Sequence, residues 1–446
     1  MNILILGAGE VGFHLTKKLS ADKYNITIVE SDPAKAQMAD DQLDAHVVRG
    51  SASSYATLKQ ADIEHCDIFA ALTNDEEANL LACQIARKLE IPHKIARVRN
   101  PEFGSPGHIL TLEEMGVDML IHPEKETANA IVRLIHRSGA TDVVEFAGGT
   151  IQLLGIRIER DSPIARKPLK EFWAEYGNLP ARIVAISRKE KTLIPSGEDH
   201  VAPGDQVFIV AEQDLIPTVI EIMGKADVRI RNIMILGGGL IGQLVARALQ
   251  DSMHMKLIES RADRSEEIAD LLQSTLVIHG DGTDMDLLAV EGIIDMDAFI
   301  AVTGDDETNI ISTLMARHLR VPRTIALVNK VEYLPITPTI GMDAVVSKKL
   351  LTVNAILHSI KHRRVESVAT IPGIEAEIIE IVAGKHSVIT RKKLRNTKFP
   401  RSAILGAVRR ENDVIIPTGE TQIRPGDRVV IFSLPRALGE VEKLFK

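Results

Sequence analysis

The chain has 446 residues, of which 45% are hydrophobic, and a formal net charge of −8. Its length favours several domains, and its composition is that of a globular protein with buried cores. The acidic balance argues against nonspecific nucleic-acid binding, which needs a basic surface. No stretch approaches the 18 or more uncharged apolar residues that indicate a membrane-spanning helix.

The cysteine content and the start of the chain indicate a cytosolic protein. Cys66 and Cys83 are the two cysteines, and their spacing fits no metal site. So few thiols in a long chain favour a reducing compartment. Because residues 2–6 already form an apolar strand, we expect no signal peptide.

The first part of the chain alternates short apolar runs with amphipathic helical patterns. This alternation predicts parallel strands joined by crossover helices, a doubly wound α/β sheet. The expected strands are residues 2–6, 25–29, 45–48, 67–72 and 94–98. The expected helices are residues 11–20, 33–41, 54–61, 75–89 and 105–115, followed by a linking helix near 124–137.

A segment of different character follows. Residues 142–158 are rich in Val and Ile and predict strands, and Pro203-Gly204-Asp205 precedes another strand. Proline followed by glycine suits the two central positions of a type II turn, because glycine supplies the positive φ. We interpret this turn as structural.

The whole pattern then repeats. Residues 232–346 repeat the alternation, 348–361 predict a second linking helix, and 366–382 a second set of strands. The shift is 230 residues at first and 222 later, where Pro425-Gly426-Asp427 matches the earlier turn. This is a duplicated unit rather than a solenoid, whose periods are much shorter. The predicted lobes are residues 1–123, 142–226, 230–350 and 365–446.

Each half opens with a glycine-rich loop between a strand and a helix. This is the context in which G-x-G-x-x-G predicts a nucleotide site: the glycines allow a tight turn, close approach of a pyrophosphate and helix–strand packing. The helix N-terminus offers N–H groups to the phosphates. The loop residues expected to bind are Gly7, Gly9, Glu10, Val11 and Gly12, and Gly237, Gly239, Leu240, Ile241 and Gly242.

An acidic residue ends the second strand of each half. Glu30 and Glu259 lie 18 and 17 residues past the last glycine of their loops. A carboxylate there accepts hydrogen bonds from the adenosine ribose hydroxyls and repels a 2′-phosphate. NAD(H) is therefore expected in preference to NADP(H).

Further candidates follow the third, fourth and fifth strands. Ser51 and Asp281 are expected near an adenine ring, and Thr73 and Thr303 at the crevice beyond the carboxyl ends of the strands. Arg97 and Arg99 are candidates for phosphate contact, whereas the second half has Asn329 and Lys330 in that region, so its site should differ. For four acidic or amide residues, helix capping and ligand contact are equally open interpretations: Asn74, Asp75, Asp305 and Asp306.

No catalytic or metal-ligating residue is predicted. A dehydrogenase needs a substrate domain and a proton-handling residue beside the nicotinamide. The β-rich segments are only about 80 residues each, and the histidines are scattered without an acid–base partner. Nucleotide sensing is therefore favoured over turnover, with an NAD-dependent oxidoreductase and a nucleotide-binding scaffold without a channel as alternatives.

These motifs, in this order and twice over, resemble the RCK (also called KTN) family. The resemblance rests on the glycine loops, Glu30 and Glu259, Thr73 to Asn79, Ala96 to Glu102 and the Pro-Gly-Asp turns, and covers nearly the whole chain. It implies two tandem Rossmann-type doubly wound parallel sheets, each followed by a small α+β C-terminal lobe. Two departures are Ser51, where an acidic residue is common, and the lack of an Arg97 equivalent in the second half.

The resemblance also implies a function. Tandem RCK chains regulate bacterial Trk potassium uptake: they bind NAD(H) or ATP/ADP and change the conductance of a TrkH- or TrkG-type membrane subunit. Such chains assemble as rings, so four tandem chains would supply eight units. The expected location is cytoplasmic, peripheral on the inner face of the cell membrane.

Overall fold

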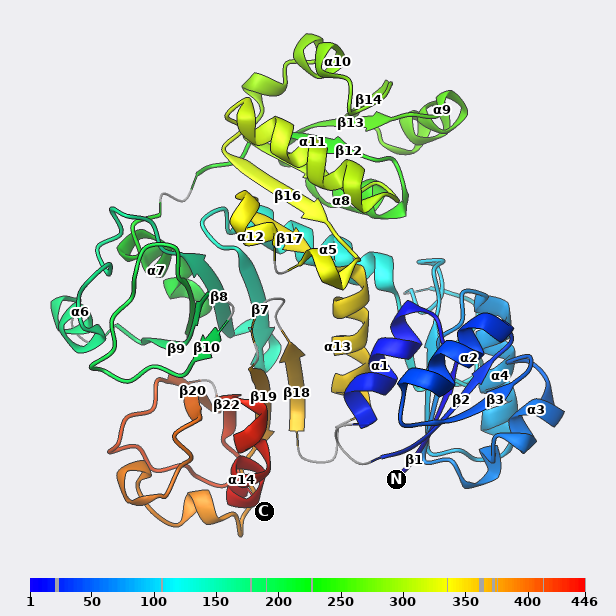
Figure 1. Cartoon of the computed structure of the whole chain (residues 1–446), viewed down its shortest axis with the longest axis horizontal. Helices are drawn as coiled ribbons and strands as arrows, with labels where there is room; N and C mark the ends of the chain where they lie inside the picture. Colours follow the sequence, from blue (N-terminus) through cyan, green and yellow to red (C-terminus); the bar gives the residue numbers. More distant parts are fainter. Residues whose placement is uncertain are drawn as a thin grey trace. The chain divides into compact units, whose positions relative to one another are not determined.

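The computed structural model describes residues 1–20, 24–105, 107–176, 179–189, 191–225, 228–334, 336–360, 365–370, 374, 376–411 and 413–445. It divides into two compact units (Figure 1). Unit 1 comprises residues 1–127 and 347–360, and unit 2 comprises residues 128–346 and 361–446.

Unit 1 is built around a six-stranded parallel sheet. Its strand order is β3-β2-β1-β4-β5-β6, the order of a dinucleotide-binding fold. The strands are β1 (Asn2–Leu6), β2 (Asn25–Glu30), β3 (His46–Arg49), β4 (Ile68–Ala71), β5 (His93–Arg97) and β6 (Met119–Ile121). The helices are α1 (Glu10–Ser20), α2 (Pro33–Gln42), α3 (Tyr55–Gln60), α4 (Glu76–Lys88) and the start of α5 (Pro123–His136).

The expected helix at residues 105–115 is wrong. The described residues there form turns, in which Gly104 and Gly107 have φ of +73° and +91°. Ile109 is 90% exposed, so a helix here would bury no apolar face that could stabilise it. Residue 106, within this range, lies outside the described residues. The short strand β6 follows and completes the sheet.

A helix from the second half of the chain covers one face of this sheet. α13 (Lys348–Ile360) packs beside α1 (Figure 1), with Val353, Ile356 and Leu357 buried in the same core as Ile5 and Leu15. The ring Nε2 of His93 lies 2.7 Å from Oγ of Ser359. The core of the first sheet is therefore completed by residues from the second half.

Unit 2 contains a second six-stranded parallel sheet of the same order, β14-β13-β12-β15-β16-β17. Its strands are β12 (Asn232–Leu236), β13 (His254–Glu259), β14 (Thr275–His279), β15 (Ala298–Ala301), β16 (Arg323–Leu327) and β17 (Ala344–Val346). Its helices are α8 (Leu240–Leu249), α9 (Ala262–Leu271), α10 (Met285–Val290), α11 (Asp306–His318) and α12 (Thr337–Ile340).

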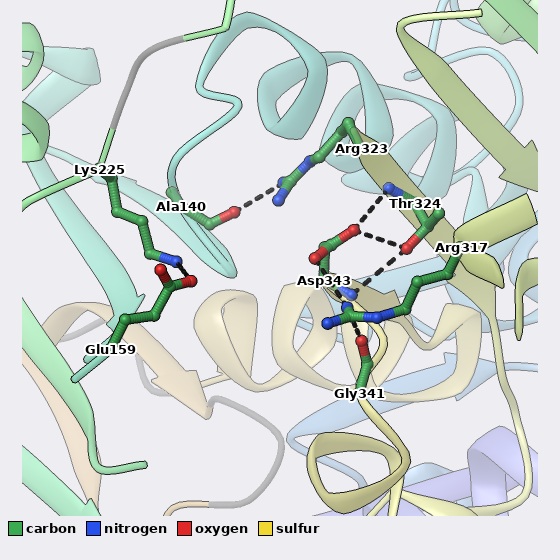
Figure 2. Close-up of polar contacts among 8 residues, drawn as sticks. All are labelled: Ala140, Glu159, Lys225, Arg317, Arg323, Thr324, Gly341 and Asp343. Carbon is green, nitrogen blue, oxygen red and sulfur yellow. Dashed lines mark hydrogen bonds and ion pairs between the residues drawn. The ribbon is translucent and has the colours of Figure 1, made fainter. Parts of the chain in front are cut away.

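The linking helix of the first half meets this second sheet. Buried Arg323, at the start of β16, donates to the carbonyl oxygens of Leu134 (3.2 Å) and Ala140 (2.6 Å). Figure 2 shows the bond to Ala140, and beside it the Asp343 carboxylate accepting from Thr324 and Arg317. Residues from the end of α5 and just beyond thus contact the sheet of the other half, as α13 does in unit 1.

Two five-stranded antiparallel sheets complete unit 2. The first has the order β10-β9-β11-β8-β7 and the second β18-β19-β22-β20-β21. The first is formed by β7 (Asp142–Phe146), β8 (Ile151–Arg157), β9 (Ala181–Arg188), β10 (Lys191–Leu193) and β11 (Gln206–Glu212), with α6 (Leu169–Glu175) and α7 (Ile216–Ile222). The second is formed by β18 (Val365–Thr370), β19 (Glu377–Val382), β20 (Ala403–Arg410), β21 (Asp413–Ile415) and β22 (Arg428–Ser433), with α14 (Pro435–Phe445). Of the strand segment expected at 366–382, residues 371–373 and 375 lie outside the described residues.

The two antiparallel sheets share one core. Phe146 and Phe208 of the first pack in one cluster with Ile378 and Phe432 of the second. Arg409 donates to the carbonyl oxygen of Ala147 at 2.7 Å and Arg182 to that of Leu405 at 3.2 Å. The two β-rich segments therefore form a single body with a shared core.

The Pro-Gly-Asp turns are structural. Gly204 and Gly426 have φ of +90° and +91°, and the N–H of Asp205 donates to the carbonyl of Ala202 at 3.0 Å, as in a type II turn. The buried carboxylate of Asp205 pairs with Arg188 at 2.6 Å, and that of Asp427 with Arg410 at 2.7 Å. Each aspartate ties its turn to a neighbouring strand.

Candidate functional site

The three glycines of the first loop have separate roles. Gly7 has φ of +99°, and a Cβ there would lie 3.2 Å from the Cα of Thr73. A Cβ on Gly12 would lie 1.9 Å from the carbonyl oxygen of Gly7, so helix α1 can pack this closely only without a side chain. A Cβ on Gly9 would meet no heavy atom within 4 Å. Gly9 is therefore the position at which a ligand can approach the backbone.

Glu30 is held in place by the loop that it supports. It is 8% exposed, and its two oxygens accept hydrogen bonds from the N–H groups of Ala8 (2.7 Å) and Asp32 (2.8 Å). Oε1 also accepts from Oγ of Ser31 at 3.4 Å, so the second lone pair of Oε2 is the acceptor left for a ribose hydroxyl. Glu259 repeats this arrangement, accepting from Gly238 and Arg261 at 3.0 Å each.

These residues surround a cavity of about 670 Å³ in unit 1. Seven of the predicted first-half residues line it: Gly7, Gly9, Glu10, Val11, Glu30, Thr73 and Arg97. Gly12 and Ser51 do not line the cavity. Such a volume lies within the range of small-molecule and cofactor sites.

Arg97 brings a positive charge to the cavity. Its Nη1 donates to the side-chain oxygen of Asn74 at 2.8 Å, whereas its Nε is buried without a hydrogen-bond partner among the described residues. Burial lowers the pKa of Arg97, which the carboxylate of Glu124 partly offsets. An unsatisfied buried donor on a cation favours binding of an anion. Arg99 lies outside the cavity lining, and its Nε is 3.9 Å from the Glu124 carboxylate.

A buried amide that was not predicted as a site residue organises the crevice. The side-chain oxygen of Asn79 accepts from the N–H (3.1 Å) and Oγ1 (2.6 Å) of Thr73. Its amide nitrogen donates to the carbonyls of Thr73 (3.1 Å) and Arg97 (2.9 Å). Asn309 makes the same bonds to Thr303 and Leu327. Repetition of Thr and Asn six residues apart was the sequence signal.

The structure identifies helix caps among the acidic candidates. Asp75 accepts from the N–H of Ala78 at 2.9 Å, and Asp305 from that of Thr308 at 2.7 Å, as N-caps do. Asp306 instead accepts from the N–H groups of Asn329 and Lys330 at 2.9 and 2.7 Å. Asp75 and Asn74 also line the cavity, so capping and ligand contact are compatible there.

Ser51 and Asp281 both stabilise the turn that follows the third strand. Oδ1 of Asp281 accepts from the N–H (2.9 Å) and Oγ1 (2.8 Å) of Thr283, which lowers the pKa of Asp281. Oγ of Ser51 lies 3.0 Å from Oγ of Ser53. Adenine contact by these two residues stays a prediction.

The second loop repeats the geometry of the first. Gly237 has φ of +109°, a Cβ on Gly242 would lie 2.1 Å from the carbonyl oxygen of Gly237, and a Cβ on Gly239 would meet nothing within 4 Å. Leu240 and Ile241 begin α8. Leu327 ends β16 where Arg97 ends β5, so the second half lacks that guanidinium, as expected.

Several cavity-lining residues were missed as candidates, among them Lys35, Pro123, Lys348 and Lys349. Lys348 and Lys349 belong to α13, more than 250 residues from Arg97 in sequence. The strand–helix pattern places them in the second half and carries no signal that they reach the first site.

The described residues contain no group of three or more His, Cys, Asp or Glu side chains placed to hold a metal ion. Cys66 and Cys83 are free and buried, and burial raises the pKa of each thiol to about 12. Both thiols are therefore protonated and poorly reactive at neutral pH. None of the helices in the described part of the chain is long and apolar enough to span a bilayer.

Comparison with solved structures shows the fold. The GsuK RCK domain superposes with a TM-score of 0.62 at 20% identity, covering 100% of this chain and 94% of that one. The GsuK channel bound to NAD gives 0.62 at 19% identity, covering 100% and 78%.

Comparison of sequences shows the family. The TrkA-N domain model matches residues 3–123 and 233–348, and the TrkA-C domain model matches 153–224 and 378–446. The Trk system potassium uptake protein TrkA of Azorhizobium caulinodans is 34% identical over 100% of this chain and 99% of its own length. That of Haemophilus influenzae is 33% identical over 100% and 99%. The chain therefore belongs to the family of Trk system potassium uptake proteins TrkA, with TrkA-N and TrkA-C domains in tandem.

Proposed function

We propose that the chain is a cytoplasmic, nucleotide-sensing regulatory subunit of a Trk-type potassium uptake system. The observation that carries the proposal is the cavity of unit 1, in which the open backbone at Gly9, the Glu30 carboxylate and the Arg97 guanidinium converge. These three groups match a pyrophosphate, a ribose diol and a further phosphate of one nucleotide. NAD(H), ATP and ADP all carry these features.

The family supports the transport role. The relatives over the full length are named potassium uptake proteins, and the GsuK channel, which shares the fold, has been solved bound to NAD and to ADP. The partner we propose is a TrkH- or TrkG-type potassium-translocating membrane subunit, with this chain attached to its cytoplasmic face. The domains we propose remain residues 1–123, 142–226, 230–350 and 365–446.

The mechanism is differential binding. A nucleotide shifts a conformational equilibrium only as far as it binds one state better than another. A coupling of about 1–3 kcal/mol would change partner opening roughly 5- to 150-fold. The phosphates are the distinguishing feature, because NAD(H), ATP and ADP share the adenosine.

An NAD-dependent oxidoreductase is the alternative. The titratable side chains among the described residues that line the cavity are carboxylates, lysines and Arg97, and the lining includes neither histidine nor cysteine. Glu30 already accepts two backbone hydrogen bonds, so it is held as an acceptor and not poised to transfer a proton. This lining favours binding over turnover.

Two measurements test the proposal. Calorimetry on the full chain should detect binding of NADH, NAD, ATP and ADP. Potassium flux through the membrane subunit in vesicles should change at least 5-fold when nucleotide is added together with the chain. Nucleotide binding with unchanged flux would favour a scaffold without a channel. Sustained NADH oxidation with any substrate pool would favour the oxidoreductase.

We also propose a homo-oligomeric ring of four tandem chains. Within one chain, the two antiparallel sheets already share a core, so each chain supplies one paired building block. Light scattering on the purified chain should give four times the 48.9 kDa chain mass. A stable monomer at micromolar concentration would contradict the ring.

A further inference from the structure

The nucleotide cavity of the first half contains two lysines from the second half. Lys348 and Lys349 open helix α13 and line the cavity with Gly9, Thr73 and Arg97. All of these residues belong to unit 1. The cavity is therefore composite: one half of the duplicated chain supplies the loop and the other supplies part of the wall.

The lysines are held firmly by the rest of their helix. Val353 and Ile356 are fully buried and Leu357 is 3% exposed, all in the core beneath α1. Ser359, at the far end of α13, lies 2.7 Å from the ring nitrogen of His93. The backbone at the start of α13 is therefore fixed beside the cavity.

Charge is unbalanced at this end of the cavity. Nζ of Lys348 lies 3.3 Å from Oε1 of Glu124, and the same carboxylate oxygen is 3.9 Å from Nε of Arg99. One carboxylate thus faces two cations. Its other oxygen is buried without a hydrogen-bond partner among the described residues.

Lys349 forms no ion pair in the described part of the chain, although carboxylates line the same cavity. It is 9% exposed, lines the cavity, and makes no hydrogen bond or ion pair with any described residue. Nε of Arg97 is likewise buried and unpartnered among those residues. A buried cation is costly unless an anion accompanies it. Arg97 has Glu124 and Glu10 nearby, but its Nε and the Lys349 ammonium have no hydrogen-bond acceptor among the described residues, and an anionic ligand would supply one.

These lysines are specific to the second half. Val346 ends β17 as Ile121 ends β6, so Lys348 and Lys349 correspond to Pro123 and Glu124. The duplication has thus placed a basic pair at the start of one linking helix and an acidic residue at the start of the other.

We propose that Lys348 and Lys349 bind the terminal phosphate of a nucleotide whose adenosine and first phosphates lie on the Gly9 loop. This inference rests on the proposed function and deepens it. Arg97, Lys348 and Lys349 together read how many phosphates the ligand carries. Because the lysines begin α13, the phosphate count in the first site acts on a helix that the second half of the sequence contributes to unit 1.

The test compares ATP and ADP on the full chain with a silenced second loop. In a Gly239→Val background, the double variant Lys348→Met/Lys349→Met should lose about 10- to 100-fold in ATP affinity, the range for one or two charge-assisted hydrogen bonds. ADP and NADH affinities should fall less than 3-fold. The ATP-to-ADP affinity ratio therefore collapses toward one.

Two control variants keep the result interpretable. Lys348→Arg/Lys349→Arg keeps both charges and should retain a preference for ATP, whereas Lys88→Met removes an exposed lysine of α4 and should leave the ratio unchanged. Melting temperatures report whether the variants fold. If ATP, ADP and NADH all fail to bind the parent chain, the proposed function fails. If they bind and the Met variant keeps the ATP-to-ADP ratio, only this inference is overturned.

Discussion

The side-chain amide of Asn79 donates a hydrogen bond to the carbonyl oxygen of Arg97 at 2.9 Å. It ties helix α4 to the last residue of β5 and fixes the backbone from which the guanidinium enters the cavity. In the second half, Asn309 makes the matching bond to Leu327 at 3.0 Å. This hydrogen-bonded frame, Asn79 to Arg97 and Asn309 to Leu327, is duplicated, but the guanidinium that it presents in the first half has no counterpart in the second.

This relationship predicts the effect of Arg97→Leu, which gives the first half the residue of the second. The frame tolerates leucine at Leu327, so the melting temperature should change little. With Gly239→Val silencing the second loop, calorimetry should show ATP affinity reduced about 10-fold or more, the loss of one charge-assisted hydrogen bond. Arg99→Leu, outside the cavity lining, is the matched control. Unchanged ATP affinity in Arg97→Leu would remove this residue from the site.

The glycine loops predict a separation of binding from folding. Gly9→Val with Gly239→Val should abolish binding of labelled NADH and ATP in a chain that still folds, because neither Cβ meets an atom within 4 Å. Gly12→Val should instead destabilise the protein, because its Cβ would lie 1.9 Å from the Gly7 carbonyl oxygen. Circular dichroism and binding measured on the same samples distinguish the two. Normal binding by the double variant would show that the loops are not the nucleotide sites.

The packing of α13 predicts where a stability change appears. Leu357→Ala should destabilise unit 1 by about 2–5 kcal/mol, the usual result of truncating a buried leucine. Hydrogen exchange should report the loss in β1 and α1, although the substitution lies in the second half. Leu271→Ala, at a position 54% exposed on α9, should have little effect. Protection lost only in peptides 232–346 would contradict the packing.

Asp142 predicts a pH dependence of stability. Burial raises its pKa from 3.8 to about 6, against the opposing effects of the Thr141 hydroxyl and the Arg323 charge. The folded state therefore holds this proton more tightly than the unfolded state. The contribution of Asp142 to the free energy of unfolding is full below pH 4 and is lost as pH rises to 6. Over that window the free energy of unfolding of the unsubstituted protein should fall by at most about 3 kcal/mol, and Asp142→Asn should remove this fall. Urea unfolding of both proteins at pH 4, 5, 6 and 7 measures it, and parallel curves would contradict the assignment.

The elements of each sheet were predictable because their signals are local. Apolar runs such as Asn2–Leu6 and the glycine loop that follows have lengths and spacings that specify a strand, a turn and a helix. The error at residues 105–115 has a local cause too: Ile109 and Leu110 are exposed and Gly104 and Gly107 adopt positive φ, so this segment forms turns.

The composition of the site was only partly predictable. The loop residues, Glu30 and Arg97 follow strand ends, and parallel strands bring their carboxyl ends to one edge of the sheet. Lys348 and Lys349 reach the same cavity through a long-range tertiary contact, the packing of α13 on the first sheet. Periodicity shows which face of that helix is apolar, but not which of two nearly identical sheets it covers.

The packing of α13 has a consequence for synthesis. The first sheet is complete at Ile121, yet the helix that covers its face ends at Ile360. At a translation rate of about 5–20 residues per second, the ribosome needs on the order of 10 to 50 s to make the intervening chain. During that interval the apolar surface around Ile5 and Leu15 lacks its native cover. We therefore expect the nascent first lobe to expose this surface until α13 is synthesised, which makes the order of synthesis differ from the order in which the first core can be completed.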